Sequence, residues 1–342
     1  MNSKRIVYTA AIVFFLVGSI LGGTILGSSG LSVDTVLAVL KMKLLDIDNI
    51  NLPSSTVYII WNLRLPRAIL AIAAGGGLAV CGVSMQAITQ NVLADPYILG
   101  VSSGASAMVS FAFFLGGVFF ASGIVVQAFA FLGAIIAMFL VYYVGAIKGR
   151  TSNSRLVLAG MAVSIILNAT SQFFITMSNE KVTRSITMWM MGSLAEARWN
   201  NVIFPLIASL IGFFFFFVNA GAYDLISLGD ETAISMGINA TKIRKCTMLM
   251  VAFVTGAIVS CCGIIGLVGF VIPHIVRFLF GSGHRGVIPI SYLVGCIFLV
   301  WMDVIARLVL APQEIPIGIF TAFCGGPFFV WLLYQHNRTI AK

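Results

Sequence analysis

Residues 58–86 read Y-I-I-W-N-L-R-L-P-R-A-I-L-A-I-A-A-G-G-G-L-A-V-C-G-V-S-M-Q, and this stretch decides the class of the protein. After Arg67 it continues for 19 residues without a charged side chain. A helix needs about 20 mainly apolar residues to cross the hydrocarbon core of a membrane. The stretch is therefore predicted to be a membrane-spanning helix.

The rest of the chain has the same character. Of its 342 residues 60% are hydrophobic and only 9% are charged, against about 25% charged in an average soluble domain. So little charge excludes a soluble globular fold, and so little polarity excludes a disordered chain. We predict an all-α polytopic integral membrane protein with about ten transmembrane helices. The expected spans are 6–27, 58–86, 95–116, 123–147, 154–177, 200–220, 241–263, 265–281, 287–310 and 315–335.

The net charge of +9 is explained by basic residues at the cytoplasmic ends of membrane helices, so no nucleic-acid partner is expected. An even number of spans places both termini on one side, and Lys4 and Arg5 place that side in the cytoplasm. Two of the segments that connect the spans are long enough to form structure of their own. Residues 28–57 are then expected outside, and residues 221–240 inside.

The inner segment 221–240 contains a predicted short helix. Gly229 precedes Asp230 and Glu231, and acidic groups suit a helix N-terminus. Gly237 can end the helix six residues later. From the residues alone two interpretations stay open. The segment is either a connector that lies on lipid headgroups or a lever that docks on a cytoplasmic partner.

The residues that could carry chemistry are few. The chain has three histidines, none of them in a metal-binding motif, and it has no G-x-x-x-x-G-K-[ST] phosphate loop. We therefore expect neither an enzyme nor a metal site, and any energy for transport must come from a partner. Asp303 is the main intramembrane acid, and its i,i+4 spacing from Arg307 permits an ion pair.

Two arginines open the second span, in the sequence R-L-P-R. Arg64 and Arg67 are three residues apart and so lie near one helix face, on the predicted outer side. Arg307 is expected on the same side. These side chains either snorkel to the outer headgroups or form a docking surface for carboxylates of an external protein.

Five blocks resemble a known family. The first runs from Arg64 to Gln86, and it leads into N-V-L-A-D-P-Y-I-L-G-V-S-S-G-A-S-A at 91–107. The others are L-G-D-E-T-A-I-S-M-G-I at 228–238, G-L-V-G-F-V-I-P-H-I-V-R at 266–277 and E-I-P-I-G-I-F-T-A-F-C-G-G-P-F-F at 314–329. In order and spacing they resemble the FecCD-type permeases, the membrane subunits of ABC importers for iron–siderophores, haem and cobalamin.

The resemblance implies a type II ABC importer permease fold, with residues 1–342 as a single transmembrane domain in the bacterial cytoplasmic membrane. Such a permease holds no cofactor of its own. Its partners are a second permease subunit, two cytoplasmic ATPase subunits that bind ATP and Mg, an external substrate-binding protein and membrane lipid. The segment 221–240 then becomes the part that couples to the ATPase. The coupling residues implied are Leu228, Gly229, Asp230, Glu231, Ala233, Met236 and Gly237.

The same resemblance places a dimer-interface path along the fifth and tenth spans. In the fifth span the path would be lined by Ser164, Asn168, Ser171 and Gln172, although these side chains could equally form helix–helix hydrogen bonds. The arginines become contacts for glutamates of the binding protein. The inner gate would include Asn91 and Leu93, and by position Asn153 and Ser154. Val92 stands where the family commonly has proline, which frees the backbone of this turn.

The expected cargo is a ferric siderophore, because that is the commonest cargo of the family; haem and cobalamin are the alternatives. A rival of another class is a secondary transporter or channel that is driven by an ion gradient and needs no ATPase. The scarcity of acidic residues within the spans counts against this rival.

Overall fold

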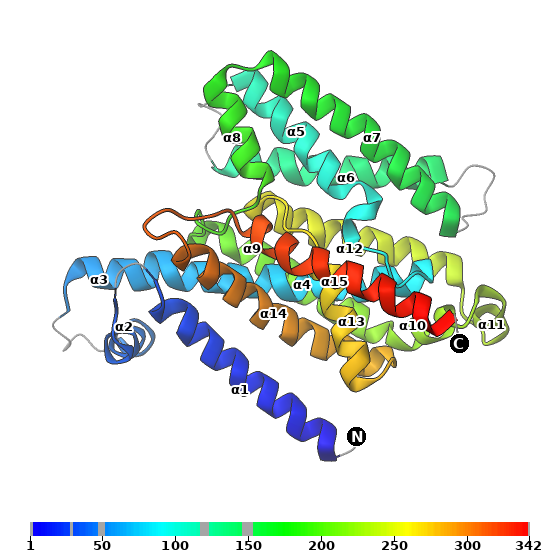
Figure 1. Cartoon of the computed structure of the whole chain (residues 1–342), viewed down its shortest axis with the longest axis horizontal. Coiled ribbons are helices and arrows are strands. Elements are labelled where there is room, and N and C mark those ends of the chain that lie inside the picture. Colours follow the sequence, from blue (N-terminus) through cyan, green and yellow to red (C-terminus); the bar gives the residue numbers. More distant parts are fainter. Residues whose placement is uncertain (1–2, 28–29, 47–51, 117–122, 146–152, 341–342) are drawn as a thin grey trace.

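The computed structural model is helical throughout the part of the chain that it describes (Figure 1), which is every residue except 1–2, 28–29, 47–51, 117–122, 146–152 and 341–342. The first helices are α1 (Ser3–Ile25), α2 (Val33–Leu45), α3 (Ser54–Tyr58), a π-helical turn (Ile59–Arg64), α4 (Leu65–Thr89), a 3-10 helix (Pro96–Leu99), α5 (Val101–Gly116), α6 (Gly123–Gly145) and α7 (Asn153–Met177). The remaining helices are α8 (Glu180–Met190), α9 (Trp199–Val218), α10 (Ala220–Ser227), α11 (Asp230–Ser235), α12 (Ala240–Cys262), α13 (Val268–Phe280), α14 (His284–Leu308) and α15 (Ile317–Ile340).

The predicted all-α membrane fold is confirmed. Among the residues that the structure describes, six helices are long and apolar enough to cross a membrane: Ser54–Thr89, Gly123–Gly145, Arg155–Met177, Trp199–Val218, Ala240–Cys262 and His284–Leu308. The same part of the chain contains four shorter apolar helices: Ala10–Ile25, Val101–Gly116, Val268–Phe280 and Ile317–Leu332. Two of the short helices fall where the sequence predicted 95–116 and 265–281. The count of ten spans stays a prediction.

Helix α4 forms the centre of the structure, and the π-helical turn joins it to α3 as one continuous rod. It contacts α9, α12, α13 and α14 (Figure 1). Glycines allow this approach. A Cβ on Gly75 would lie 2.1 Å from the carbonyl oxygen of Gly295 on α14, and one on Gly82 would lie 1.8 Å from that of Gly269 on α13. The helices therefore touch backbone to backbone, as small residues permit in membrane proteins.

A second group consists of α5, α6 and α7, which contact one another on the far side of α12 (Figure 1). Its closest crossing is also made by glycines, because a Cβ on Gly104 would lie 2.2 Å from the carbonyl oxygen of Gly133. Helix α12 contacts both α4 and α6. It therefore joins the α5–α7 group to the α4 group.

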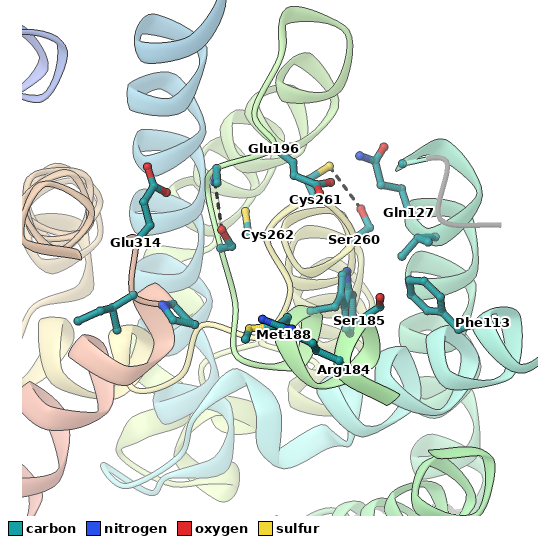
Figure 2. A pocket seen from close by; sticks show the side chains of 17 residues that line it. Phe113, Gln127, Arg184, Ser185, Met188, Glu196, Ser260, Cys261, Cys262 and Glu314 are labelled. Carbon is teal, nitrogen blue, oxygen red and sulfur yellow. Dashed lines mark hydrogen bonds between the residues drawn. The ribbon is translucent and has the colours of Figure 1, made fainter. Parts of the chain in front are cut away.

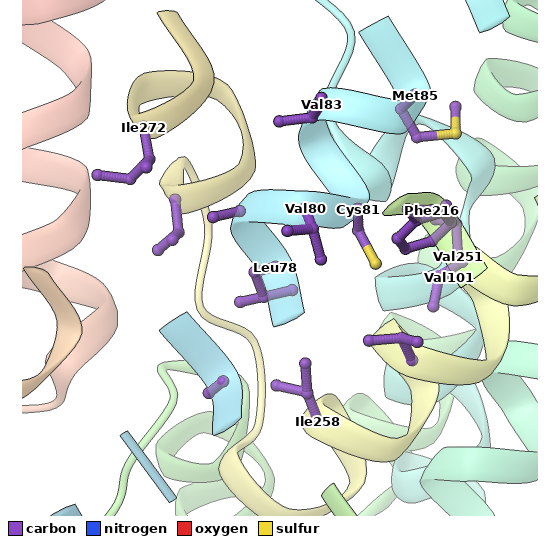
Figure 3. Close-up of a cluster of buried hydrophobic side chains, with 14 of the residues drawn as sticks. Leu78, Val80, Cys81, Val83, Met85, Val101, Phe216, Val251, Ile258 and Ile272 are labelled. Atoms are coloured by element: carbon purple, nitrogen blue, oxygen red, sulfur yellow. The ribbon is translucent and has the colours of Figure 1, made fainter. Parts of the chain in front are cut away.

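The core lies where these helices converge (Figure 3). Leu78 of α4, Phe216 of α9, Val251 and Ile258 of α12, and Ile272 of α13 are almost fully buried in one cluster. Lipid tails are as apolar as these side chains, so close van der Waals packing rather than escape from water holds the helices together.

Helices α2 and α8 lie where the sequence predicted only connections. Helix α2 occupies much of 28–57 and is capped by Ser32, whose hydroxyl accepts a hydrogen bond from Thr35 N at 3.2 Å. Helix α8 lies between the fifth and sixth predicted spans and is capped by Asn179. Both caps are visible in the sequence as polar residues before a helix, whereas neither helix has the length of a span.

Candidate functional site

The first candidate region is the end of the bundle where α4 begins, and we call it the arginine end. Arg64 Nη1 donates to the carbonyl oxygens of Thr24 and Ile25 at 2.9 and 2.8 Å. Arg307 Nη1 and Nη2 donate to two further carbonyl oxygens of the same turn at 3.0 and 2.9 Å. The last carbonyls of a helix have no partners within it, and cations are favourable there. The two arginines therefore cap the C-terminus of α1.

The third arginine joins two acids. Arg67 Nε lies 2.8 Å from Asp303 Oδ1, and its Nη1 lies 2.9 Å from both carboxylate oxygens of Glu314. The other carboxylate oxygen of Asp303 lies 3.1 Å from Arg307 Nε, which confirms the predicted i,i+4 ion pair. Asp303 is buried and Glu314 is 42% exposed. Arg67 is thus shared between a buried and an accessible carboxylate.

None of the three arginines stands free at the surface. Arg64 and Arg307 are 7% and 8% exposed, and the side chain of Arg67 is 11% exposed. Arg64 and Arg307 are directed to the backbone of α1. The docking role of the three stays a prediction, and Glu314 is the member of the cluster that solvent reaches most readily.

A cavity of about 570 Å³ lies next to this cluster (Figure 2). Its lining comes from the end of α5, the start of α6, α8, the segment after α8, the end of α12 and the loop before α15. Glu314 belongs both to this lining and to the ion pair with Arg67. The loop before α15 is fixed to the segment after α8, because Ile317 N donates to the carbonyl oxygen of Gly192 at 3.1 Å.

The second candidate region is the segment 221–240. Helix α11 begins at Asp230 and ends at Ser235, with Gly229 at φ 121° before it and Gly237 at φ 82° after it. The predicted helix and both of its glycine boundaries are therefore confirmed. Ala233 is buried. Three larger apolar side chains at and next to α11 are exposed to solvent instead: Leu228 (71%), Ile234 (63%) and Met236 (65%).

Polar contacts tie this segment to the bundle, and three of them involve charged or amide side chains. Arg244 of α12 binds Asp230 through two nitrogens, at 2.7 and 2.5 Å. Asp224 of α10 accepts from the backbone and the ring nitrogen of His284 at 2.9 and 2.6 Å, at the N-terminus of α14. Gln90, at the end of α4, donates to a carbonyl of α10 at 2.6 Å. The hydrogen bonds from Arg244 hold the pKa of Asp230 below its ordinary value of 3.8.

Comparison with known proteins identifies the family. The model of the FecCD transport family matches residues 11–335. The chain belongs to this family. The Fe(3+)-citrate import system permease protein YfmD of Bacillus subtilis is 39% identical over 80% of this chain and 80% of its own length. The vitamin B12 import system permease protein BtuC of Vibrio cholerae is 36% identical over 82% of this chain and 83% of its own length.

A solved structure of an inward-facing, metal-chelate type ABC transporter shares the fold. Its TM-score is 0.83 at 28% identity, and the alignment covers 96% of this chain and 99% of that one. This FecCD protein is accordingly a permease of the ABC importer class that serves iron chelates, haem and vitamin B12, and it is not an enzyme.

The FecCD permease forms a compact turn directly after α4. Gln90 adopts a left-handed conformation at φ 52° and ends the helix. Asn91 Oδ1 then accepts from Leu93 N at 2.9 Å, and Asp95 Oδ1 accepts from Tyr97 N at 2.9 Å. Leu93 packs against α13 and α15. Of the four predicted gate residues, Asn91 and Leu93 therefore share this turn.

The other two predicted gate residues, Asn153 and Ser154, begin α7, and their side chains lie outside the described residues. The gate role of all four stays a prediction.

The predicted path residues of the FecCD permease divide between two faces of α7. Asn168 and Gln172 are exposed, on the face that also exposes large apolar side chains such as Ile165. Ser171 is fully buried and shares a 2.8 Å hydrogen bond with Ser110 of α5. Ser164 is partly buried. The interpretation as a helix–helix hydrogen bond thus describes the contact of Ser171, while a path role for the set stays a prediction.

Several residues that build these regions were not singled out from the sequence. They are Arg244, Asp224 and His284 at the segment 221–240, and Glu314 at the arginine end. An acidic partner for Arg244 could have been predicted, because a basic residue near the start of a predicted span often pairs with an acid. No local pattern pairs Glu314 with Arg67, since 247 positions separate them.

Proposed function

We propose that this chain is the membrane-spanning subunit of an ABC importer for a ferric siderophore, energised by two separate ATPase subunits. The observation that carries the proposal is the construction of 221–240. The two short helices α10 and α11 present exposed apolar side chains at Leu228, Ile234 and Met236, and part-buried polar contacts anchor them to α4, α12 and α14. A connector that only lay on lipid would need no such anchors, whereas a lever that receives force does.

The proposal includes the rest of the assembly. Residues 1–342 act as one permease domain with both termini in the cytoplasm, and the chain pairs with a second permease subunit. The exposed face of α7 that carries Asn168 and Gln172 fits a dimer-interface path, because its mixed polar and apolar side chains suit a bulky chelate that must not bind tightly. ATP and Mg are bound by the ATPase partners. An external binding protein delivers the cargo to the arginine end.

The relatives do not separate the cargoes, because the iron-citrate permease is 39% identical to this chain and a cobalamin import permease of Halobacterium salinarum is 37% identical. The choice of a ferric chelate is supported by the structural neighbour, which is of the metal-chelate type. A binding assay on the cognate external protein, with ferric siderophores, haem and cobalamin as ligands, tests this part. Preference for haem or cobalamin would replace the cargo and leave the rest of the proposal intact.

Uptake into proteoliposomes tests the energy source. The permease reconstituted with its ATPase subunits is expected to accumulate the ferric chelate only when ATP is present. The permease alone, under a proton or sodium gradient, is expected to take up none. Uptake by the permease alone would establish the ion-driven transporter instead.

Docking is best tested at Arg67. Arg64 and Arg307 cap α1, so their substitution perturbs the fold as well as any docking surface. A carboxylate from the binding protein has to compete with Glu314 for Arg67. Arg67→Gln, which leaves Asp303 paired with Arg307, is therefore expected to weaken association of the binding protein, and Glu314→Gln is expected to strengthen it, both most clearly at low salt. Equal affinities in the two variants would exclude docking at Arg67.

A further inference from the structure

The end of α4 is held by a side chain that also holds α11. Arg244 is 2% exposed, and its Nε lies 2.8 Å from the carbonyl oxygen of Ile88 in the last turn of α4. Its two terminal nitrogens bind the carboxylate of Asp230, the first residue of α11. One planar guanidinium thus bridges the exposed segment and the central helix. Three hydrogen bonds from one rigid group fix the relative position of both partners.

The bridged turn of α4 determines where the next turn of the chain lies. Ile88 is two residues before Gln90, where the backbone leaves the helix in a left-handed conformation. Gln90 itself donates to the carbonyl of Ile226 on α10, a second contact between the same two regions. The compact turn at 91–95 follows at once, and Leu93 within it packs against α13 and α15. A shift of the last turn of α4 therefore displaces 91–95.

If the contact between α11 and α4 served only stability, it would not need the charged guanidinium of Arg244. A buried ion pair is often no more stabilising than well-packed apolar side chains of similar volume. Here the buried arginine has as its acid partner Asp230, which is 45% exposed at the start of the outermost helix. The pair extends from the exposed helix to the buried turn, which is the direction in which movement has to be transmitted.

We propose that Arg244 is the positioning residue that transmits displacement of α11 to the last turn of α4 and thereby to the turn at 91–95. The inference rests on the proposed function, since the ATPase partners supply the displacement. When α11 moves, Asp230 carries the guanidinium with it, and the bond to Ile88 pulls the end of α4. Lysine in this place keeps the charge but cannot bond both partners through a planar fork.

The test uses the complete complex of the permease dimer with its ATPase subunits. A spin label is placed at position 92, where Val92 is 53% exposed within the turn, and the distance between the two labels of the dimer is measured with and without ATP and vanadate. The variants are Arg244→Lys and Asp230→Asn. The matched control is Lys242→Gln, an exposed basic residue two positions earlier on α12.

The expected result separates transmission from structure. Arg244→Lys keeps the ATPase rate of the parent complex and a cooperative thermal transition, and both Arg244→Lys and Asp230→Asn lose the ATP-driven change in label distance. Lys242→Gln keeps the ATPase rate, the thermal transition and the distance change of the parent. A normal distance change in a folded Arg244→Lys complex, or in Asp230→Asn if the lysine variant does not fold, overturns the inference. If the parent complex itself shows no change with ATP, the proposed function fails and the inference with it.

Discussion

The contact between Gly82 and Gly269 allows a quantitative test of how closely α4 is packed. A Cβ on Gly82 would lie 1.8 Å from the carbonyl oxygen of Gly269 and 2.4 Å from its carbonyl carbon. Carbon and oxygen normally approach no closer than about 3.3 Å. Gly82→Ala therefore has to move α4 and α13 apart by about 1.5 Å at this crossing, since 3.3 less 1.8 is 1.5. The atoms that collide are backbone and cannot rotate away.

The structure also restricts the direction in which α13 can yield. A Cβ on Gly269 would lie 2.7 Å from Cδ of Pro96, so the start of α13 lies between α4 and the turn that follows α4. Overpacking usually costs about 1–3 kcal/mol. Because α13 is held between backbone on one side and the rigid ring of Pro96 on the other, we expect the upper value, about 3 kcal/mol. Alanine in place of glycine returns about 1 kcal/mol through helix propensity. The expected net loss of stability is about 2 kcal/mol.

Unfolding of the purified permease in mixed micelles, followed by titration with sodium dodecyl sulfate, measures this loss. The matched control is Gly18→Ala in α1, where no atom lies within 4 Å of the new Cβ. The control is expected to unfold at the parent's free energy or slightly above it. Equal unfolding free energies for the parent and Gly82→Ala would refute the reasoning, because they would mean that α4 and α13 separate without cost.

Three further predictions follow from the polar contacts. Asp303→Leu leaves two buried guanidiniums without their shared acid and is expected to cost about 3–5 kcal/mol in the same titration, whereas Glu314→Gln, at a half-exposed pair, should cost less than about 1 kcal/mol. Because the pKa of Asp230 is lowered in the folded protein, its stabilising contribution is complete above the ordinary pKa of 3.8 and is lost as the pH falls through the folded value. The difference in melting temperature between the parent and Asp230→Asn should therefore be constant from about pH 8 to pH 5 and shrink below about pH 4; a difference that already shrinks above pH 5 contradicts the lowered pKa. Ser171→Ala is expected to destabilise the permease by about 1 kcal/mol through the lost hydrogen bond to α5, while Asn168→Ala should leave the melting temperature unchanged; equal melting temperatures for the two variants would contradict this assignment of faces.

What the sequence predicted correctly was local. The boundaries of α11 follow from Gly229, Asp230 and Gly237, because each acts within a few residues of its own position. The pair of Asp303 with Arg307 follows from spacing on one helix. In both cases the interaction is completed inside a single element, so no knowledge of the tertiary packing was needed.

What the sequence did not predict depends on contacts between distant segments. Arg67 meets Asp303 across 236 positions, and nothing near either residue indicates the other. The sequence also could not predict which face of α7 is buried, because its apolar residues are spread around the helix and show no strong periodicity. Ser171 and Gln172 are adjacent, yet one is fully buried and the other exposed. Only the packing of α7 on α5 decides between them.

The contacts of α4 explain how a movement of α11 can shift the α5–α7 group of the permease. Between its ends, α4 touches α13 and α14 backbone to backbone, so these three helices have little room to slide against one another. The turn at 91–95 is one covalent connection from this tight unit to the α5–α7 group, and the other runs from α7 through α8 to α9. The main noncovalent contact between the two groups is α12 with α6. A pull on the end of α4 through Arg244 therefore acts where the α5–α7 group is attached, and we expect that group, with its exposed path face, to shift as one body about its contact with α12.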